Sequence, residues 1–185
     1  MIKNFIYTVL ITICMFSISS CSYNSGRKSG NKLQIGNTQT ASICNNSLYD
    51  YCVKVTKIVD GDTFHGLTKE NEQIKFRVYG IDAPERTQAF ANRSRQHFSD
   101  LIFEKTVGIK VQTKRDRYGR PIVWVYTDDG KDVGLEMLKA GMAWHYKEYD
   151  SSPEYDKCER EAREARIGLW VDNNPVAPWD FRRKK

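Results

Sequence analysis

Histidine and cysteine are scarce in this sequence. Its 185 residues include three His and five Cys, and no C-x-x-C pair or Cys/His cluster with ligand spacing occurs. Structural zinc sites need such closely spaced ligands, so zinc binding is not expected. No internal repeat is present either.

The chain also lacks long apolar runs beyond its N-terminus. Its mean hydropathy is −0.60, and 28% charged and 40% apolar residues suit a soluble body with one ordinary core. Lys and Arg outnumber Asp and Glu by 29 to 23, which gives a net charge of +6. A modest positive excess favours polyanionic partners such as nucleic acid or an anionic membrane surface, although many soluble proteins share it.

The N-terminus has the layout of a signal peptide. Lys3 precedes an apolar stretch over residues 5–16, followed by small residues that end at Cys21. The stretch is shorter than the roughly 20 residues that span a bilayer, so residues 1–20 are predicted to be cleaved. The segment resembles a bacterial lipobox, which implies lipidation of Cys21 and a membrane-anchored protein exported to the cell envelope. Plain cleavage nearby, with Cys21 incidental, is the alternative.

The remaining chain divides into three parts. Residues 21–46 are rich in Ser, Asn, Gly, Thr and Lys, which is typical of a flexible tether. The folded domain is predicted at 47–179 and a basic tail at 180–185. After export, three cysteines remain, so at most one intramolecular disulfide can form and its pairing stays open: Cys44, Cys52 and Cys158.

The hydrophobic pattern predicts an α+β fold. Alternating or β-branched runs indicate five strands: from Val53 to the turn at 60–61, then 63–67, 73–79, 107–111 and 122–126. Helical spacing indicates three helices, at about 90–102, 131–140 and from 151/152 to Gly168. Five short strands with a helix between the third and fourth predict a five-stranded OB-fold β-barrel with three helices.

Three polar clusters have the composition of a functional site. Asp60-Gly61-Asp62-Thr63 is typical of a hairpin turn, but such a turn also makes Asp62 a rigid metal ligand. Residues 77–85 read R-V-Y-G-I-D-A-P-E and are alternatively a solvated loop with an Arg77–Glu85 salt bridge. Residues 116–120 read D-R-Y-G-R and are alternatively an ordinary basic hairpin turn.

In this order the clusters resemble the staphylococcal nuclease family, whose pattern is D-G-D-T, R-x-x-x-x-D-x-P-E and D-x-Y-G-R. The resemblance extends from about Val53 to Trp170. It implies a Ca²⁺ cofactor held by the carboxylates of Asp62 and Asp82 and the backbone carbonyl of Ala83, and such oxygen ligands suit that ion. The family often has Thr in place of Ala83, but a main-chain ligand tolerates this change.

The resemblance also implies the remaining roles. Glu85 matches the glutamate that orients or deprotonates the attacking water, and Arg77 and Arg120 match the arginines that hold the phosphate. The implied activity is hydrolysis of DNA and RNA with a 5′-oxygen leaving group and 3′-phosphate products. Four residues are candidates for a substrate site that favours single strands: Arg117, Tyr118, Tyr146 and Tyr149. A monomer is expected.

Two other functions are compatible with the sequence. Related folds serve as non-catalytic nucleic-acid-binding modules when catalytic residues are lost, and a surface lipoprotein with only a structural role is also conceivable. The complete set of Arg77, Glu85 and Arg120 favours an enzyme over both. The residues leave open whether DNA or RNA is the biological target.

Overall fold

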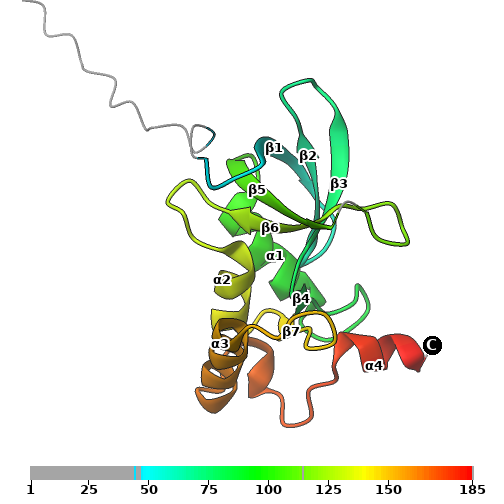
Figure 1. Ribbon diagram of the computed structural model, residues 1–185. Helices are drawn as coiled ribbons and strands as arrows, with labels where there is room; N and C mark the ends of the chain where they lie inside the picture. Colours follow the sequence, from blue (N-terminus) through cyan, green and yellow to red (C-terminus); the bar gives the residue numbers. More distant parts are fainter. Residues whose placement is uncertain (1–43, 45–46, 114, 185) are drawn as a thin grey trace, which may run out of the picture. The chain divides into compact units, whose positions relative to one another are not determined.

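A computed structural model describes residues 44, 47–113 and 115–184 of the chain (Figure 1). All of them belong to one unit, which spans residues 39–185. The predicted signal peptide, Cys21 and nearly all of the predicted tether lie outside the described residues. None of the helices in the described ranges is long and apolar enough to cross a bilayer.

Five strands close into a barrel in the order β1-β2-β3-β6-β5. They are β1 (Tyr51–Ile58), β2 (Thr63–Leu67), β3 (Gln73–Val78), β5 (Thr106–Thr113) and β6 (Ile122–Tyr126). All neighbours are antiparallel except β3 and β6, which pair in parallel with Arg77 opposite Ile122. The closed barrel confirms the OB-type fold predicted from the hydrophobic pattern.

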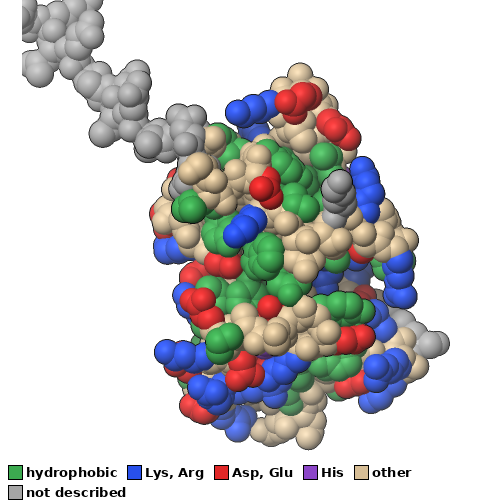
Figure 2. Space-filling view, viewed as in Figure 1, with side chains coloured by type: hydrophobic (Ala, Val, Ile, Leu, Met, Phe, Trp, Pro, Cys, Tyr) green, Lys and Arg blue, Asp and Glu red, His purple; other side chains and the backbone are tan. Residues whose placement is uncertain are grey.

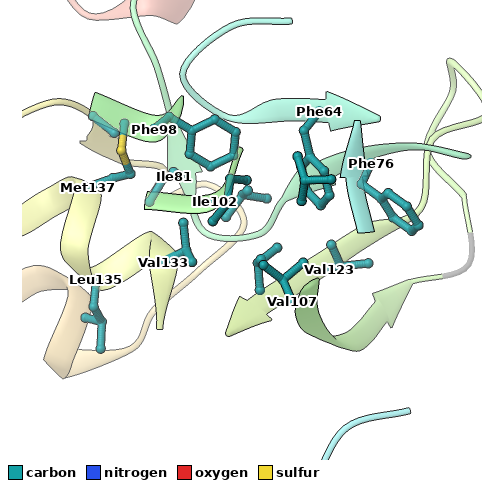
Figure 3. Packing of buried hydrophobic residues seen from close by; sticks show 14 of the residues in the cluster. Phe64, Phe76, Ile81, Phe98, Ile102, Val107, Val123, Val133, Leu135 and Met137 are labelled. Atoms are coloured by element: carbon teal, nitrogen blue, oxygen red, sulfur yellow. The ribbon is translucent and has the colours of Figure 1, made fainter. Parts of the chain in front are cut away.

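The barrel interior is filled by the apolar side chains that alternate along the strands. Phe64 of β2 stacks on Phe76 of β3 with ring centroids 5.2 Å apart, and Phe98 meets Phe64 edge-on at 6.1 Å. All three are fully buried (Figure 3). Because burying one such side chain contributes about 1.5–3 kcal/mol, this cluster holds the strands that carry the first two motifs in place.

The predicted helices correspond to α1 (Ala91–Ile102), α2 (Val133–Lys139) and α3 (Pro153–Glu164). The side chains of Asp132 and Ser152 cap α2 and α3 by accepting hydrogen bonds from Leu135 N and Tyr155 N. The prediction that the third helix extends to Gly168 was wrong. The left-handed backbone of Arg166, at φ 52°, breaks the helix first, and a 3₁₀ turn, η2 (Gly168–Val171), follows.

Two short strands outside the barrel, β4 (Ile81–Asp82) and β7 (Trp144–His145), position Asp82. They pair antiparallel, with Asp82 opposite Trp144. A further helix, α4 (Pro178–Arg183), lies beside this pair (Figure 1). The sequence pattern predicted three helices and a basic tail from residue 180. The described part of the chain instead has four α-helices, and α4 includes residues 180–183 of that tail.

Cys44, Cys52 and Cys158 are free thiols. Cys158 is buried on α3 as a small apolar side chain. Burial, followed by a hydrogen bond with Cys44, raises the pKa of the Cys52 thiol to about 12. Thiolates are the reactive form, so this pKa makes Cys52 a poor nucleophile.

Candidate active site

The first motif is a tight turn between β1 and β2. The backbone N–H of Asp62 donates to Asp60 Oδ1 at 3.1 Å, and Thr63 Oγ1 donates to Asp62 Oδ1 at 2.9 Å. Gly61 lies so close to α1 that a Cβ there would stand 1.9 Å from Ser94 Oγ and 2.8 Å from Ala83 Cβ. Only glycine permits this approach, which brings Asp62 against the loop that follows β4.

The second motif arranges two carboxylates around one arginine. Arg77, near the end of β3, contacts Asp62 Oδ2 through Nη1 at 3.1 Å and Asp82 Oδ1 through Nη2 at 2.9 Å. Its Nη1 also donates to the carbonyl oxygens of Val78 and Ile81. The expected alternative, an Arg77–Glu85 salt bridge, does not form among the described contacts of Arg77.

The backbone of the second motif completes the environment of Asp62. The N–H of Ala83 donates to Asp62 Oδ2 at 2.7 Å, so the candidate backbone ligand lies against a candidate carboxylate ligand. Asp62 and Asp82 are only 5% and 2% exposed. The two carboxylates predicted to share a cation are therefore adjacent to the same guanidinium and withdrawn from bulk water.

The third motif is a turn between β5 and β6 that directs Arg120 back to the barrel. Gly119, at φ 75°, makes the turn, and Asp116 Oδ1 accepts hydrogen bonds from the N–H groups of Tyr118 and Arg120. Asp116 Oδ2 accepts from Arg120 Nε at 2.9 Å and lies 2.8 Å from its Nη2. This two-pronged contact fixes the plane of the guanidinium.

The hydroxyl of Thr63 joins the third motif to the first. Arg120 Nη1 donates to Thr63 Oγ1 at 3.3 Å, and Thr63 Oγ1 in turn donates to Asp62. Arg77, Arg120, Asp62 and Asp82 thus belong to one hydrogen-bonded network, although 58 residues separate Asp62 from Arg120 in sequence. The structure therefore brings the three motifs together at one place.

Negative charge is concentrated in this network. Burial, followed by the charge of Asp62, raises the pKa of Asp82 to about 6, although Arg182 and Arg77 oppose the shift. Burial and the charge of Asp62 likewise raise the pKa of Asp60 to about 7. Burial is the largest cause of both shifts, because withdrawal from water disfavours the charged form of a carboxyl group.

The donor set fits a hard divalent cation. Asp62 and Asp82 offer buried carboxylate oxygens beside the backbone of Ala83, and Ca²⁺ accepts carboxylates, backbone carbonyls and water together. Within the described ranges, no group of three or more His, Cys, Asp or Glu side chains is placed to hold a metal ion. An ion here would consequently rely on two carboxylates, main-chain oxygen and water.

Comparison with known proteins places this network in a family. Residues 75–172 match the family described as "Staphylococcal nuclease homologue". An uncharacterized endonuclease of Haemophilus influenzae is 46% identical over 132 residues, which cover 71% of this chain and 73% of the relative. A micrococcal nuclease of Shigella flexneri is 38% identical over 144 residues, with 72% and 82% covered.

The chain belongs to the staphylococcal nuclease family. Protein ParB of Escherichia coli is a further relative, 37% identical over 141 residues that cover 71% of this chain and 78% of ParB. The family and the names of these relatives support an enzyme that hydrolyses nucleic acids, and the expected family resemblance is confirmed. The family match includes Arg77, Asp82, Glu85 and Arg120, whereas the Asp60–Thr63 turn precedes it.

Glu85, the candidate base of the nuclease, lies in the loop after β4. Its backbone N–H donates to Gln88 Oε1 at 3.0 Å, which anchors the loop. Its carboxylate accepts a hydrogen bond from Arg182 Nη1 of α4 at 2.8 Å. Arg182 also reaches Asp82, so the C-terminal helix joins the network from outside the three motifs.

Sequence reasoning missed Arg182. Residues 180–185 were predicted to be a basic tail because the last four residues, Arg182 to Lys185, are all cationic. A signal for a helix was nevertheless present. Pro178 occupies the first helical turn, where proline is favoured, and Trp179 beside it can anchor a helix to an apolar surface.

The four candidate substrate residues fall into two groups. Arg117 and Arg120 both lie over the ring of Tyr118, at 4.8 and 5.2 Å from its centroid. Tyr146 and Tyr149 contact each other edge-on at 4.8 Å. Tyr118 and Tyr149 are 67% and 62% exposed, and the ring of Tyr118 is held beside two guanidinium groups that can contact a phosphate.

A cavity of about 620 Å³ adjoins the second group. Tyr146, Trp144 and Trp179 line it together with Arg160 and Arg163 of the α3 region, but none of the candidate catalytic or metal residues does. Trp144 is buried against Trp170, with ring centroids 4.5 Å apart. Trp144 thus has a packing role.

Proposed function

We propose that this nuclease is a Ca²⁺-dependent endonuclease that hydrolyses phosphodiester bonds in DNA and RNA. The observation that carries the proposal is the network in which Arg77 contacts both Asp62 and Asp82 and Arg120 reaches Asp62 through Thr63. Phosphodiester cleavage needs positive charge around the phosphoryl oxygens and a positioned water. Carboxylates, guanidinium groups and a separate glutamate in one place can provide both.

Asp62, Asp82 and the carbonyl of Ala83 would hold the ion. When bound, Ca²⁺ supplies positive charge to the phosphate and a coordination site for water. Glu85 would orient the attacking water and accept its proton. The water oxygen would bond to phosphorus as the bond from phosphorus to the 5′-oxygen breaks. The 5′-oxygen would take up a proton from solvent water, and the 3′-phosphate would remain on the other product.

Arg77 and Arg120 would bind the phosphate as its charge shifts in the transition state. Each guanidinium is already oriented, Arg77 by Asp62, Asp82 and two carbonyl oxygens and Arg120 by Asp116. This preorganisation reduces the entropy lost when substrate binds. Lys and Arg side chains lie on the side of the molecule with the β5–β6 loop and α4, and also over the region of α3 (Figure 2).

The substrate strand is proposed to lie across Tyr118 on one side and Tyr146 and Tyr149 on the other, with Arg117 on a neighbouring phosphate. Base stacking on exposed aromatic rings favours single strands, because paired bases do not expose their faces. The enzyme is proposed to act as a monomer.

Removal of Ca²⁺ is expected to abolish cleavage. In excess calcium chelator, cleavage of single-stranded DNA and RNA by the full-length chain in detergent should fall to the background rate, because Asp62 and Asp82 then lack their ion. Mg²⁺ should substitute poorly, since it demands a tighter octahedral shell. Full activity in chelator would contradict the proposal.

The non-catalytic binding module remains the competing function. It predicts that the chain binds single-stranded DNA with the salt dependence of phosphate contacts but never shortens it. Gel analysis of end-labelled DNA, with Ca²⁺ present, distinguishes the two. Products with 3′-phosphate ends support the nuclease, and intact DNA at saturating protein supports the module.

We also propose that the nuclease is exported and anchored to the bacterial envelope through lipid on Cys21. Because the lipid on Cys21 is the proposed membrane anchor, Cys21→Ala should abolish incorporation of labelled fatty acid. The variant protein should also move from the membrane fraction to the soluble fraction. Cys44→Ala is the matched control and should retain both. Membrane association that survives in Cys21→Ala would indicate an uncleaved N-terminal helix instead.

A further inference from the structure

Arg182 is held against two carboxylates by three contacts. Its Nη2 donates to Asp82 Oδ2 at 2.9 Å, and its Nη1 donates to Asp82 Oδ1 at 3.3 Å and to Glu85 Oε1 at 2.8 Å. The residue lies on α4, beyond the region that matches the nuclease family. None of the three motifs explains why a C-terminal arginine enters the candidate active site.

The contacts of Arg182 use the oxygens that a cation would need. Both oxygens of Asp82 accept hydrogen bonds from guanidinium groups, Oδ1 from Arg77 and Arg182 and Oδ2 from Arg182. Asp82 is 2% exposed, so water reaches it poorly and its charge requires a partner inside the protein. Arg77 supplies one such partner at Oδ1, and Arg182 supplies the partner at Oδ2.

The charge balance argues against simultaneous binding of Arg182 and a divalent cation. The carboxylates in ion pairs with Arg77 or Arg182 are Asp62, Asp82 and Glu85, and these five side chains carry three negative and two positive charges. A divalent ion with Arg77 alone would neutralise the three carboxylates. Retaining Arg182 as well would leave an excess positive charge and would keep Asp82 Oδ2 occupied.

Helix α4 has an anchor of its own. Trp179 stacks on Tyr146 with ring planes 5° apart and centroids at 5.3 Å, and it meets Trp144 edge-on at 5.6 Å. The side chain of Arg182 is 40% exposed, so it can turn to solvent while the helix stays in place. Its guanidinium is therefore a tethered charge beside the site.

We propose that Arg182 is an internal counter-ion of the cation site, which a divalent ion displaces from Asp82 and Glu85 and which thereby sets the affinity of the nuclease for Ca²⁺. The inference rests on the proposed function, because it assumes that Asp82 is a ligand. The positive charge of Arg182 stabilises the carboxylates without ion, and this stabilisation is lost when the ion binds. Arg182 consequently weakens Ca²⁺ binding.

Calcium titration of the full-length chain in detergent, followed by calorimetry, tests this role. Arg182→Gln should bind Ca²⁺ about tenfold more tightly than the wild type, because a partly exposed charge-assisted contact no longer competes. Arg183→Gln is the matched control. It removes the same charge from the same helix, but Arg183 contacts only Asp180 among its described ion pairs, so its affinity should match the wild type within about twofold.

Two further variants make the outcome decisive. Arg182→Lys keeps the charge but loses the two-pronged contact, so its affinity should lie between those of the wild type and Arg182→Gln. Asp82→Asn should show no Ca²⁺ binding in the titration, and this result would establish that the titration reports binding at Asp82. Near-ultraviolet circular dichroism and Trp fluorescence check that α4 stays docked in each variant.

Unchanged or weaker Ca²⁺ binding by folded Arg182→Gln would overturn the inference while leaving the Ca²⁺ site intact. If Arg182→Gln failed to fold, unchanged or weaker Ca²⁺ binding by folded Arg182→Lys would overturn the inference instead. Absence of calcium binding in both the wild type and the Arg182 variants would overturn the proposed Ca²⁺ site and this inference together. If Arg183→Gln also bound Ca²⁺ more tightly than the wild type, the change in affinity would be due to net charge rather than to the contacts of Arg182, and the inference would be wrong.

Discussion

Glu85→Gln is expected to lower the initial rate of DNA cleavage roughly 100- to 1000-fold at saturating Ca²⁺. Glutamine keeps the size and hydrogen-bonding reach of the side chain but cannot accept a proton from water. The fold should survive, because the contact of Glu85 with Arg182 joins partly exposed side chains, and such pairs contribute about 0–1 kcal/mol. The measurement is the initial rate on single-stranded DNA, with circular dichroism as the test of folding.

Two comparisons isolate catalysis in this variant. Glu70→Gln removes the same charge from the exposed β2–β3 hairpin and should cleave at the wild-type rate. Association of Glu85→Gln with DNA should hardly change, because bulk binding depends on summed Lys and Arg contacts and falls with salt. A folded Glu85→Gln protein that cleaves at the wild-type rate would show that the proposed active site is wrong.

Arg120→Lys is expected to reduce cleavage about 100-fold or more, which is the cost of removing one preorganised donor from a transition state. Lysine retains the charge but has no planar fork, so it cannot keep the contacts with Asp116 Oδ2 through Nε and Nη2 and still reach Thr63. The change therefore tests geometry rather than charge. Initial rates over a range of DNA concentrations separate a loss in kcat from a loss in KM.

The matched control for this change is Arg95→Lys. Arg95 is an exposed arginine on α1, far from the β5–β6 turn in the chain, and its replacement should leave the rate within about twofold of the wild type. A loss confined to KM in Arg120→Lys would assign Arg120 to ground-state binding of the phosphate. Equal activity of the two variants would exclude Arg120 from the active site.

The barrel was predictable because its strands face water on one side and the core on the other. Val53 and Val55 alternate with Lys54 and Thr56, and this period of two marks a strand before any partner is known. Strands β2 and β6 were predicted with their observed bounds. Helix ends were less accessible, since the end of α3 depends on the left-handed backbone of Arg166, for which no glycine or proline provides a signal.

The candidate active-site residues were identified by the resemblance of the three motifs, in their order, to the staphylococcal nuclease family. Asp62, Asp82, Arg77 and Arg120 carry recognisable neighbours, such as the glycines of the turns and Pro84, because their local backbone must be special for the site to form. The contacts between them were not predictable in the same way. A salt bridge between Arg77 and Glu85 was the simplest local alternative, yet Arg77 pairs with Asp62 and Asp82.

The sequence by itself determined the barrel, through short-range patterns of polarity and turn chemistry. It also determined the residues proposed for catalysis, through the resemblance of its three motifs to the staphylococcal nuclease family. Only the tertiary structure decided the partners of those residues. Thr63 connects Arg120 to Asp62, and Arg182 of α4 reaches Asp82 across 100 residues of chain. Such contacts depend on which segments the tertiary fold brings together, because a buried carboxylate requires a cation within reach.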